Sequence, residues 1–263
     1  MEIDVSKTLP VGFTFNLDQP STPMLRIRNL LLLILFFSFQ GCKDEPFKDL
    51  DLKLRAETDH FKFYCDKALD DNAVNAIKVR LENNYTNLLS KYRISALPKI
   101  NILIWSDRDK FNAQSDYPGA IGYVTGRQEI RMLRVGTLGA TTALHEFVHI
   151  LTLFVNNDFA NRPRWLWESI AVFESGDLVQ PKSLPYMVSG NYPTLLELNQ
   201  ALDTNQKVYD VGYTIAEFIV VNWDYETLIN LIKSNGNIQG TLNITTQEFE
   251  LQWYSHVKEE YLM

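Results

Sequence analysis

The sequence predicts an α+β domain in which a small mixed sheet comes first and a mainly helical half follows. Short apolar or alternating runs at residues 61–65 and 100–105 are typical of strands. Residues 120–124 and 129–133 flank a Thr-Gly-Arg tripeptide, and this spacing indicates a β-hairpin. After residue 137, apolar residues recur at helical spacing almost to the C-terminus.

Local patterns predict each element of the first half. Residues 61–65 (FKFYC) alternate as a strand does, and residues 68–91 carry apolar side chains at the spacing of a long helix. Residues 100–105 (INILIW) form the most apolar of these runs, which indicates a central strand. Asp107 is expected to cap a short helix that contains Phe111.

The second half is expected to be helical throughout. Residues 137–155 predict one helix, and residues 163–175 predict another with Pro163 near its first turn. There is no internal repeat and no second domain boundary, so a single folded domain is expected. Further helices are expected over residues 194–202, 208–223, 225–233 and 246–261.

Composition excludes several classes of protein. The chain has 263 residues, of which 46% are hydrophobic, and these values exclude a disordered or fibrous chain. Its net charge of −7 comes without a basic stripe, so no nucleic-acid partner is expected. With only two cysteines, Cys42 and Cys65, a disulfide framework and a cysteine-rich zinc site are both excluded.

The N-terminal segment reads as a targeting signal. Residues 30–39 form an apolar run that follows Arg26 and Arg28 and is shorter than the ~20 residues needed to span a bilayer. A glycine directly before Cys42 ends this segment, which resembles a bacterial lipoprotein signal with cleavage before Cys42 and lipidation of that cysteine. A start at Met24 gives the conventional leader. An uncleaved membrane anchor and a buried core helix are the alternatives.

These expectations divide the chain into a signal region at residues 1–41, a lipidated tether at 42–55 and a folded domain at 56–263. The lipid on Cys42 then anchors the protein to the outer membrane in the bacterial cell envelope. The charged residues 43–45 resemble the surface-export signal of some lipoproteins, and an ordinary charged tether is the alternative. Cys65 is expected to be a buried small hydrophobe without a partner.

The chemistry-bearing motif is His-Glu-Phe-Val-His at residues 145–149. On an α-helix, His145 and His149 project from one face, so both imidazoles can bind one Zn²⁺. Glu146 points about 100° away from His145, where a general base for a zinc-bound water belongs. The apolar flanks predict a buried helix, in which such polar groups are costly unless they are paired or bind a metal.

Catalytic zinc needs a third protein ligand, and Glu168 is the best candidate. Eighteen residues separate it from His149, which is enough for the first helix to end, a loop to form and a second helix to return antiparallel. The other two histidines, His60 and His256, are not well placed in the sequence. We therefore expect His145, His149 and Glu168 to hold the metal.

This arrangement resembles the gluzincin metallopeptidases. The combination of His-Glu-x-x-His, eighteen residues and a glutamate inside Trp-Leu-x-Glu-x-x-Ala is similar to the peptidase MA-like group and to the catalytic domain of the alanyl and leukotriene-type aminopeptidases. Ser169 stands where those proteins carry glycine. The resemblance implies a zincin-like, thermolysin-like fold with an edge hairpin, and a zinc-dependent peptidase activity.

Three further expectations come from the same resemblance. Tyr209 begins a Tyr-x-x-Gly element whose tyrosine stabilises the oxyanion, with Tyr213 as the fallback. Residues 119–123 or 129–133 form the edge strand that pairs with substrate, although plain sheet structure is the alternative reading. Glu174 is a candidate to accept a hydrogen bond from a ligand histidine, or it is simply solvated.

The sequence thus predicts a zinc-dependent hydrolase that acts on a peptide or protein. The glutamate-bearing motif that anchors a substrate α-amine in the aminopeptidases is missing, which favours an endopeptidase. The competing hypothesis is a surface-anchored binding lipoprotein whose metal site is structural or vestigial.

Overall fold

The computed structural model describes residues 50–134, 136, 138–200 and 206–263. The expected signal region, Cys42 and the first part of the tether lie outside the described residues. Within the described part, no helix combines the length and the apolar character that crossing a membrane requires.

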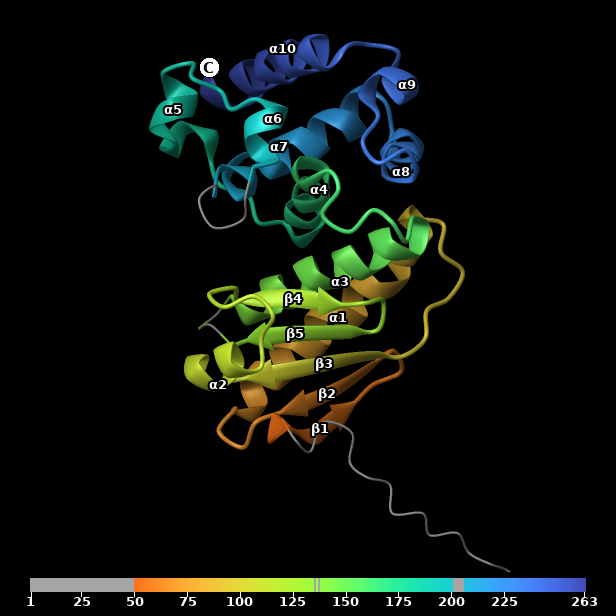
Figure 1. The fold of residues 1–263 in the computed structure, drawn as a ribbon, viewed down its shortest axis with the longest axis vertical. Helices are drawn as coiled ribbons and strands as arrows, with labels where there is room; N and C mark the ends of the chain where they lie inside the picture. The colour runs from red at the N-terminus through yellow and green to blue at the C-terminus, as the bar shows by residue number, and fades with distance from the viewer. Residues whose placement is uncertain (1–49, 135, 137, 201–205) are drawn as a thin grey trace, which may run out of the picture. The chain divides into compact units, whose positions relative to one another are not determined.

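A five-stranded mixed sheet forms the first half of the domain, and the expected α+β class is confirmed (Figure 1). The strand order is β1-β2-β3-β5-β4. β2 pairs with β3, and β3 with β5, in parallel, whereas the outer pairs β1–β2 and β4–β5 are antiparallel. The strands are β1 (Lys53–Glu57), β2 (Phe61–Cys65), β3 (Ile100–Trp105), β4 (Gly122–Thr125) and β5 (Glu129–Leu133).

Strand β1 was not predicted, and it includes residues 53–55 of the expected tether. The folded domain therefore begins before residue 56. The sequence of β1, KLRAE, alternates polar and apolar residues, but the run is only five residues long and four of its five side chains are exposed. β1 pairs with the edge of β2 that β3 leaves free.

Helices cover both faces of the sheet. One face of β2, β3 and β5 shares a hydrophobic core with α1 (Asp71–Lys91) and α3 (Gly139–Val155). The other face packs against Phe111 of α2 (Arg108–Ala113) in a smaller cluster that includes Trp105 and Tyr123. α1 begins three residues later than expected because the Asp70 side chain caps it by accepting from the backbone N–H of Ala73.

The second half is helical, as expected, and α3 lies between it and the β4 edge of the sheet (Figure 1). α6 ends at Leu198, earlier than expected, and α5 and α9 are helices of four and five residues that the sequence pattern did not reveal. The helices are α4 (Arg164–Ser175), α5 (Pro185–Val188), α6 (Leu195–Leu198), α7 (Lys207–Asn222), α8 (Tyr225–Lys233), α9 (Ile238–Leu242) and α10 (Thr246–Val257), with a 3-10 turn at Pro181–Ser183 and a π-helical turn at Lys258–Leu262.

The packing of α7 on α4 brings residues far apart in sequence together. Gly212 of α7 lies directly against Ser169 of α4, because a Cβ on Gly212 would lie only 3.0 Å from the Ser169 Cα. Ser169 is fully buried, and its hydroxyl donates to the Trp165 carbonyl within the helix. This close approach places the first turn of α7 beside the middle of α4.

Candidate metal centre

Helix α3 carries both histidines of the predicted motif on one face. The Nε2 atoms of His145 and His149 lie 3.1 Å apart, as the i, i+4 spacing predicts. Most of α3 is buried, and only a helix that is apolar nearly all round can be enclosed in this way. The two imidazoles are therefore held in the interior, at the side of α3 that faces α4.

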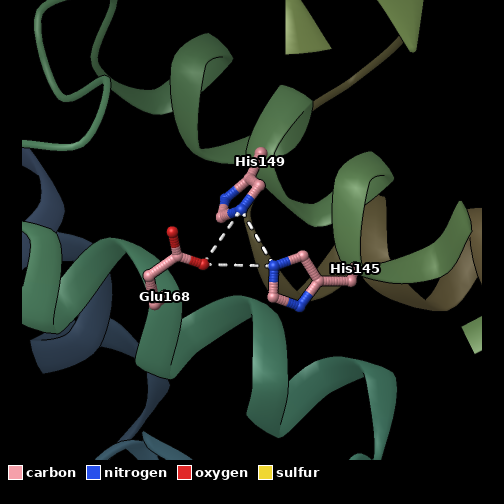
Figure 2. A group of neighbouring side chains, drawn as sticks. All are labelled: His145, His149 and Glu168. Atoms are coloured by element: carbon pink, nitrogen blue, oxygen red, sulfur yellow. Dashed lines mark hydrogen bonds and ion pairs between the residues drawn. The ribbon is translucent and has the colours of Figure 1, made fainter. Parts of the chain in front are cut away.

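Glu168 of α4 completes the cluster, as predicted (Figure 2). Its Oε2 lies 3.2 Å from Nε2 of His145 and 3.5 Å from Nε2 of His149. Tetrahedral ligands about 2.0–2.1 Å from a zinc ion lie about 3.3–3.4 Å from one another. The three ligand atoms already have nearly this separation, so the group could bind a metal ion. Among the residues described, no other set of three histidine, cysteine or acidic side chains is so arranged.

The charges within the cluster are set by burial and by the pairing of its members. Burial opposes ionisation of Glu168, but hydrogen bonds with His145 and His149 outweigh it and hold its pKa well below its ordinary value. Burial also disfavours the charged form of His145, but its bond to Glu168 raises its pKa. For His149, burial and the neighbouring charge of His145 lower the pKa to about 4. His149 is therefore neutral at pH 7, which is the form that binds metal.

Glu146 lies beside the cluster, against strand β4. A Cβ on Gly122 would lie 2.7 Å from Oε1 of Glu146, so the absence of a side chain at Gly122 leaves the room that this carboxylate occupies. Burial raises the pKa of Glu146 to about 7. The nearby charge of His145 opposes this increase, and the negative charge of Glu168 adds to it. A carboxyl group with this pKa can both accept and release a proton near neutral pH.

Tyr209 reaches the cluster from the first turn of α7. Its hydroxyl donates to Oε1 of Glu168 at 3.3 Å, and the guanidinium of Arg164 lies 5.4 Å from the centre of its ring. Burial, reinforced by Glu168, raises the pKa of Tyr209, so the phenol remains a hydrogen-bond donor. Tyr213 packs instead on Phe173, so of the two predicted tyrosines it is Tyr209 that lies at the site.

Glu174 does not act as a partner of the histidines. Its carboxylate accepts from Nζ of Lys91 at 2.8 Å and from the hydroxyl of Tyr92 at 3.3 Å, and its side chain is buried. Glu174 is therefore neither a partner of a ligand histidine nor solvated, because the C-terminal end of α1 and the residue after it supply its partners. His60 and His256 lie away from the cluster, on Glu82 and Glu217.

The sheet order decides between the two candidate edge strands. β5 lies between β3 and β4, so residues 129–133 are interior, and β4 is the edge strand beside α3. β4 begins at Gly122, within the expected segment, and ends two residues beyond it. The edge strand thus passes the carboxylate of Glu146.

Sequence reasoning missed three residues around the cluster: Gly122, Arg164 and Trp167. Gly122 leaves space for Glu146, Arg164 lies over Tyr209, and Trp167 stacks on His149 with ring centroids 4.1 Å apart. Each acts across elements that are distant in sequence. The proximity of Arg164 and Trp167 to Glu168 in the chain is the one signal that could have indicated two of them.

No model of a known protein family matches the chain, and no curated protein matches it either. What the protein does must therefore be argued from the geometry of this cluster.

Proposed function

We propose that the protein is a zinc-dependent metallohydrolase, specifically a peptidase of the gluzincin type with a zincin-like domain. The observation that carries the proposal is the triangle of ligand atoms from His145, His149 and Glu168. A buried carboxylate, Glu146, lies between this triangle and an open sheet edge. A purely structural metal site has no use for such a carboxylate.

His145, His149 and Glu168 are the residues that would hold the zinc ion, in the three-ligand set typical of catalytic sites. Bound there, zinc supplies a water of lowered pKa and polarises the carbonyl under attack. The three ligands come from two helices packed in the core, so the set is held rigidly. Such rigidity preserves the open fourth position that catalysis requires.

Glu146 is the general base of this proposal. It takes the proton of the attacking water and delivers it to the leaving amine. Its elevated pKa suits both steps, because the proton must be held only briefly. Its position against Gly122 keeps the carboxylate close to whatever lies along the edge of β4.

Strand β4 is where a peptide would bind, and this feature favours a peptide over a small amide. The Ile121 carbonyl accepts from the N–H of Leu133 at 2.8 Å, so alternate residues of this strand direct their backbone groups toward β5. By that alternation, Gly122 and Val124 direct theirs to the open side. A peptide strand added there by β-augmentation brings its main chain beside Glu146.

Tyr209 supplies the second oxyanion donor. Its hydroxyl is protonated and points into the cluster, where it now donates to Glu168. A donor already aimed at the place where negative charge develops stabilises the transition state without rearrangement. In this role the phenol exchanges its carboxylate partner for the oxyanion of the substrate.

We also propose that Cys42 anchors the enzyme to the outer membrane of a bacterial cell. The lipoprotein-like leader supports this location, and the charged residues 43–45, which resemble a surface-export signal, favour exposure of the domain on the cell surface. Labelling with radioactive palmitate, in wild type and in Cys42→Ser, tests it. Label that is equal in both would exclude lipidation at this cysteine.

The function is tested with three matched glutamate variants of the full chain: Glu168→Gln, Glu146→Gln and Glu174→Gln. Zinc content is measured by elemental analysis, and activity with a pool of internally quenched peptides blocked at both ends. Wild type should hold one zinc per chain. Glu168→Gln should lose zinc, whereas Glu146→Gln should keep zinc and lose turnover.

Glu174→Gln is the control, because Glu174 is buried on the same helix but pairs with Lys91 and Tyr92. It should retain both zinc and activity. Wild type without zinc, even after zinc is added back, would refute the metal centre. If both wild type and Glu146→Gln bind zinc and cleave peptides equally well, the proposed mechanism is refuted. If both bind zinc and neither cleaves, a binding protein with a structural metal is favoured.

A further inference from the structure

The ring of His149 lies flat against the indole of Trp167. The two ring centroids are 4.1 Å apart, and the planes differ by 4°. Both side chains are buried, so neither ring shares this contact with bulk water. Trp167 directly precedes Glu168, so one turn of α4 provides a cluster carboxylate and the surface on which a cluster imidazole rests.

His149 lacks the hydrogen bond that usually orients a metal-binding imidazole. A ligand histidine almost always donates its second ring N–H to a carboxylate, a carbonyl or a water. Nδ1 of His149 is buried and has no hydrogen-bond partner among the described residues. The Nδ1 side of this ring is therefore held by a contact other than a protein hydrogen bond.

Trp167 is itself held in place from a second direction. Phe159, which is fully buried, contacts the indole with ring centroids 5.7 Å apart and planes inclined by 55°. Phe159 therefore opposes movement of the indole away from the imidazole. Rotation of the His149 ring would drive its edge into the face of a fixed aromatic group, which costs packing on both sides.

This stack holds the His149 ring in the plane in which its Nε2 faces the other two ligand atoms. In it, Nε2 of His149 points to Nε2 of His145 at 3.1 Å and to Oε2 of Glu168 at 3.5 Å (Figure 2). The His145 ring is perpendicular to the His149 ring and does not stack on it. Of the two contacts, only the one with Trp167 is therefore a face-to-face stack on His149.

We propose that Trp167 is a positioning residue for His149, and that aromatic stacking takes the place of the missing hydrogen-bond acceptor in orienting this metal ligand. This inference rests on the proposed metal centre. It assigns Trp167 a role in metal affinity beyond its part in the core. It also predicts that a flat ring at position 167 is what matters, and that the indole N–H is dispensable.

The test measures zinc affinity of the full chain by competition with a chromogenic chelator. Trp167→Leu removes the flat surface and should weaken zinc binding by about 10- to 100-fold, the usual effect of losing the group that orients a ligand. Trp167→Phe keeps an aromatic face and should retain most of the affinity. This rescue separates stacking from general loss of packing.

Trp165→Leu is the matched control. Trp165 lies two residues earlier on α4, is equally buried and packs on Phe249 rather than on His149. Its substitution should lower the thermal stability as much as that of Trp167, but leave the zinc affinity of the folded protein unchanged. Tryptophan emission adds a direct readout: zinc should change it in wild type and leave it nearly unchanged in Trp167→Phe.

The outcomes separate this inference from the function on which it rests. If wild type binds no zinc, the metal centre and the role of Trp167 both fail. If wild type binds zinc and Trp167→Leu binds it equally well, only the positioning role is overturned. Equal weakening by Trp167→Leu and Trp165→Leu would also overturn it, because affinity would then follow helix packing in general.

Discussion

The contact between α7 and α4 makes Gly212 a position where a single added methyl group should destabilise the protein. A Cβ there would lie 3.0 Å from Cα and 3.3 Å from Oγ of Ser169. The nearer obstacle is main chain in a fully buried helix, and it cannot rotate aside. The two helices must separate, and Tyr209, one turn earlier on α7, moves away from Glu168 with them.

Two opposing effects set the size of the change. Replacing glycine by alanine inside a helix stabilises it by ~0.8–1.0 kcal/mol. Overpacking a tight core costs ~1–3 kcal/mol, and a backbone obstacle places this contact toward the upper end of that range. The cost of overpacking should therefore exceed the gain in helix propensity. Gly212→Ala should lower the free energy of unfolding by about 1–2 kcal/mol, which corresponds to roughly 2–8 °C in Tm for a domain of this size.

Urea unfolding of the full chain, followed by far-UV circular dichroism, measures this difference. Gly139→Ala is the control, because a Cβ on that helical glycine meets its nearest neighbours, Ile77 and Met132, only at ordinary distances of 3.8 and 3.9 Å. The same substitution should therefore be neutral or stabilising in α3 and destabilising in α7. A Gly212→Ala protein as stable as wild type would refute the argument that the helices touch here.

Three other predictions can be tested on the same protein. Gly122→Ala should retain zinc but lose turnover by ~100-fold, because its Cβ would lie 2.7 Å from the carboxylate of Glu146; unchanged turnover would contradict this. Removing zinc with a chelator should lower Tm, since saturation at 1,000 times Kd adds about 4 kcal/mol to stability; a Tm independent of zinc would contradict it. Burial opposes ionisation of Glu82, but hydrogen bonds from Thr58 and His60 hold its pKa below the ordinary 4.5. The ionised carboxylate therefore stabilises the protein above pH 4.5, and this contribution is lost as the pH falls through the lowered pKa of Glu82. Urea titrations should accordingly show Glu82→Gln less stable than wild type at pH 7 and the difference shrinking in acid; a difference that persists at low pH would refute the linkage.

The cluster could be predicted from sequence because its geometry is local. His145 and His149 are four residues apart on one helix, and helical periodicity alone places their rings together. Glu168 required one more step, the return of a second helix, which the length of the intervening segment allows. In each case a regular element carries the side chain, and regular elements are what sequence patterns reveal best.

The surroundings of the cluster depend on contacts that no local pattern encodes. Gly122 matters because β4 passes Glu146, and the partners of Glu174 lie at the C-terminal end of α1 and just after it, more than eighty residues earlier in the chain. Four of the five side chains of β1 are exposed, and the strand takes its backbone partners from β2. Such features arise when elements pack, so they become visible only in three dimensions.

The two buried carboxylates of the site show how one environment can produce two chemical roles. Glu146 and Glu168 are both enclosed, and burial alone would raise the pKa of each. Glu168 accepts from two imidazoles and remains ionised, as the proposed metal ligand must, whereas Glu146 has weaker compensation and a pKa of about 7, which suits the proposed base. Substituting the histidines should therefore raise the pKa of both groups: Glu168 should become harder to ionise, and Glu146 should lose the attraction of His145 as well. The division of roles thus depends on the imidazole pair, which makes α3 the element that organises the chemistry of the site.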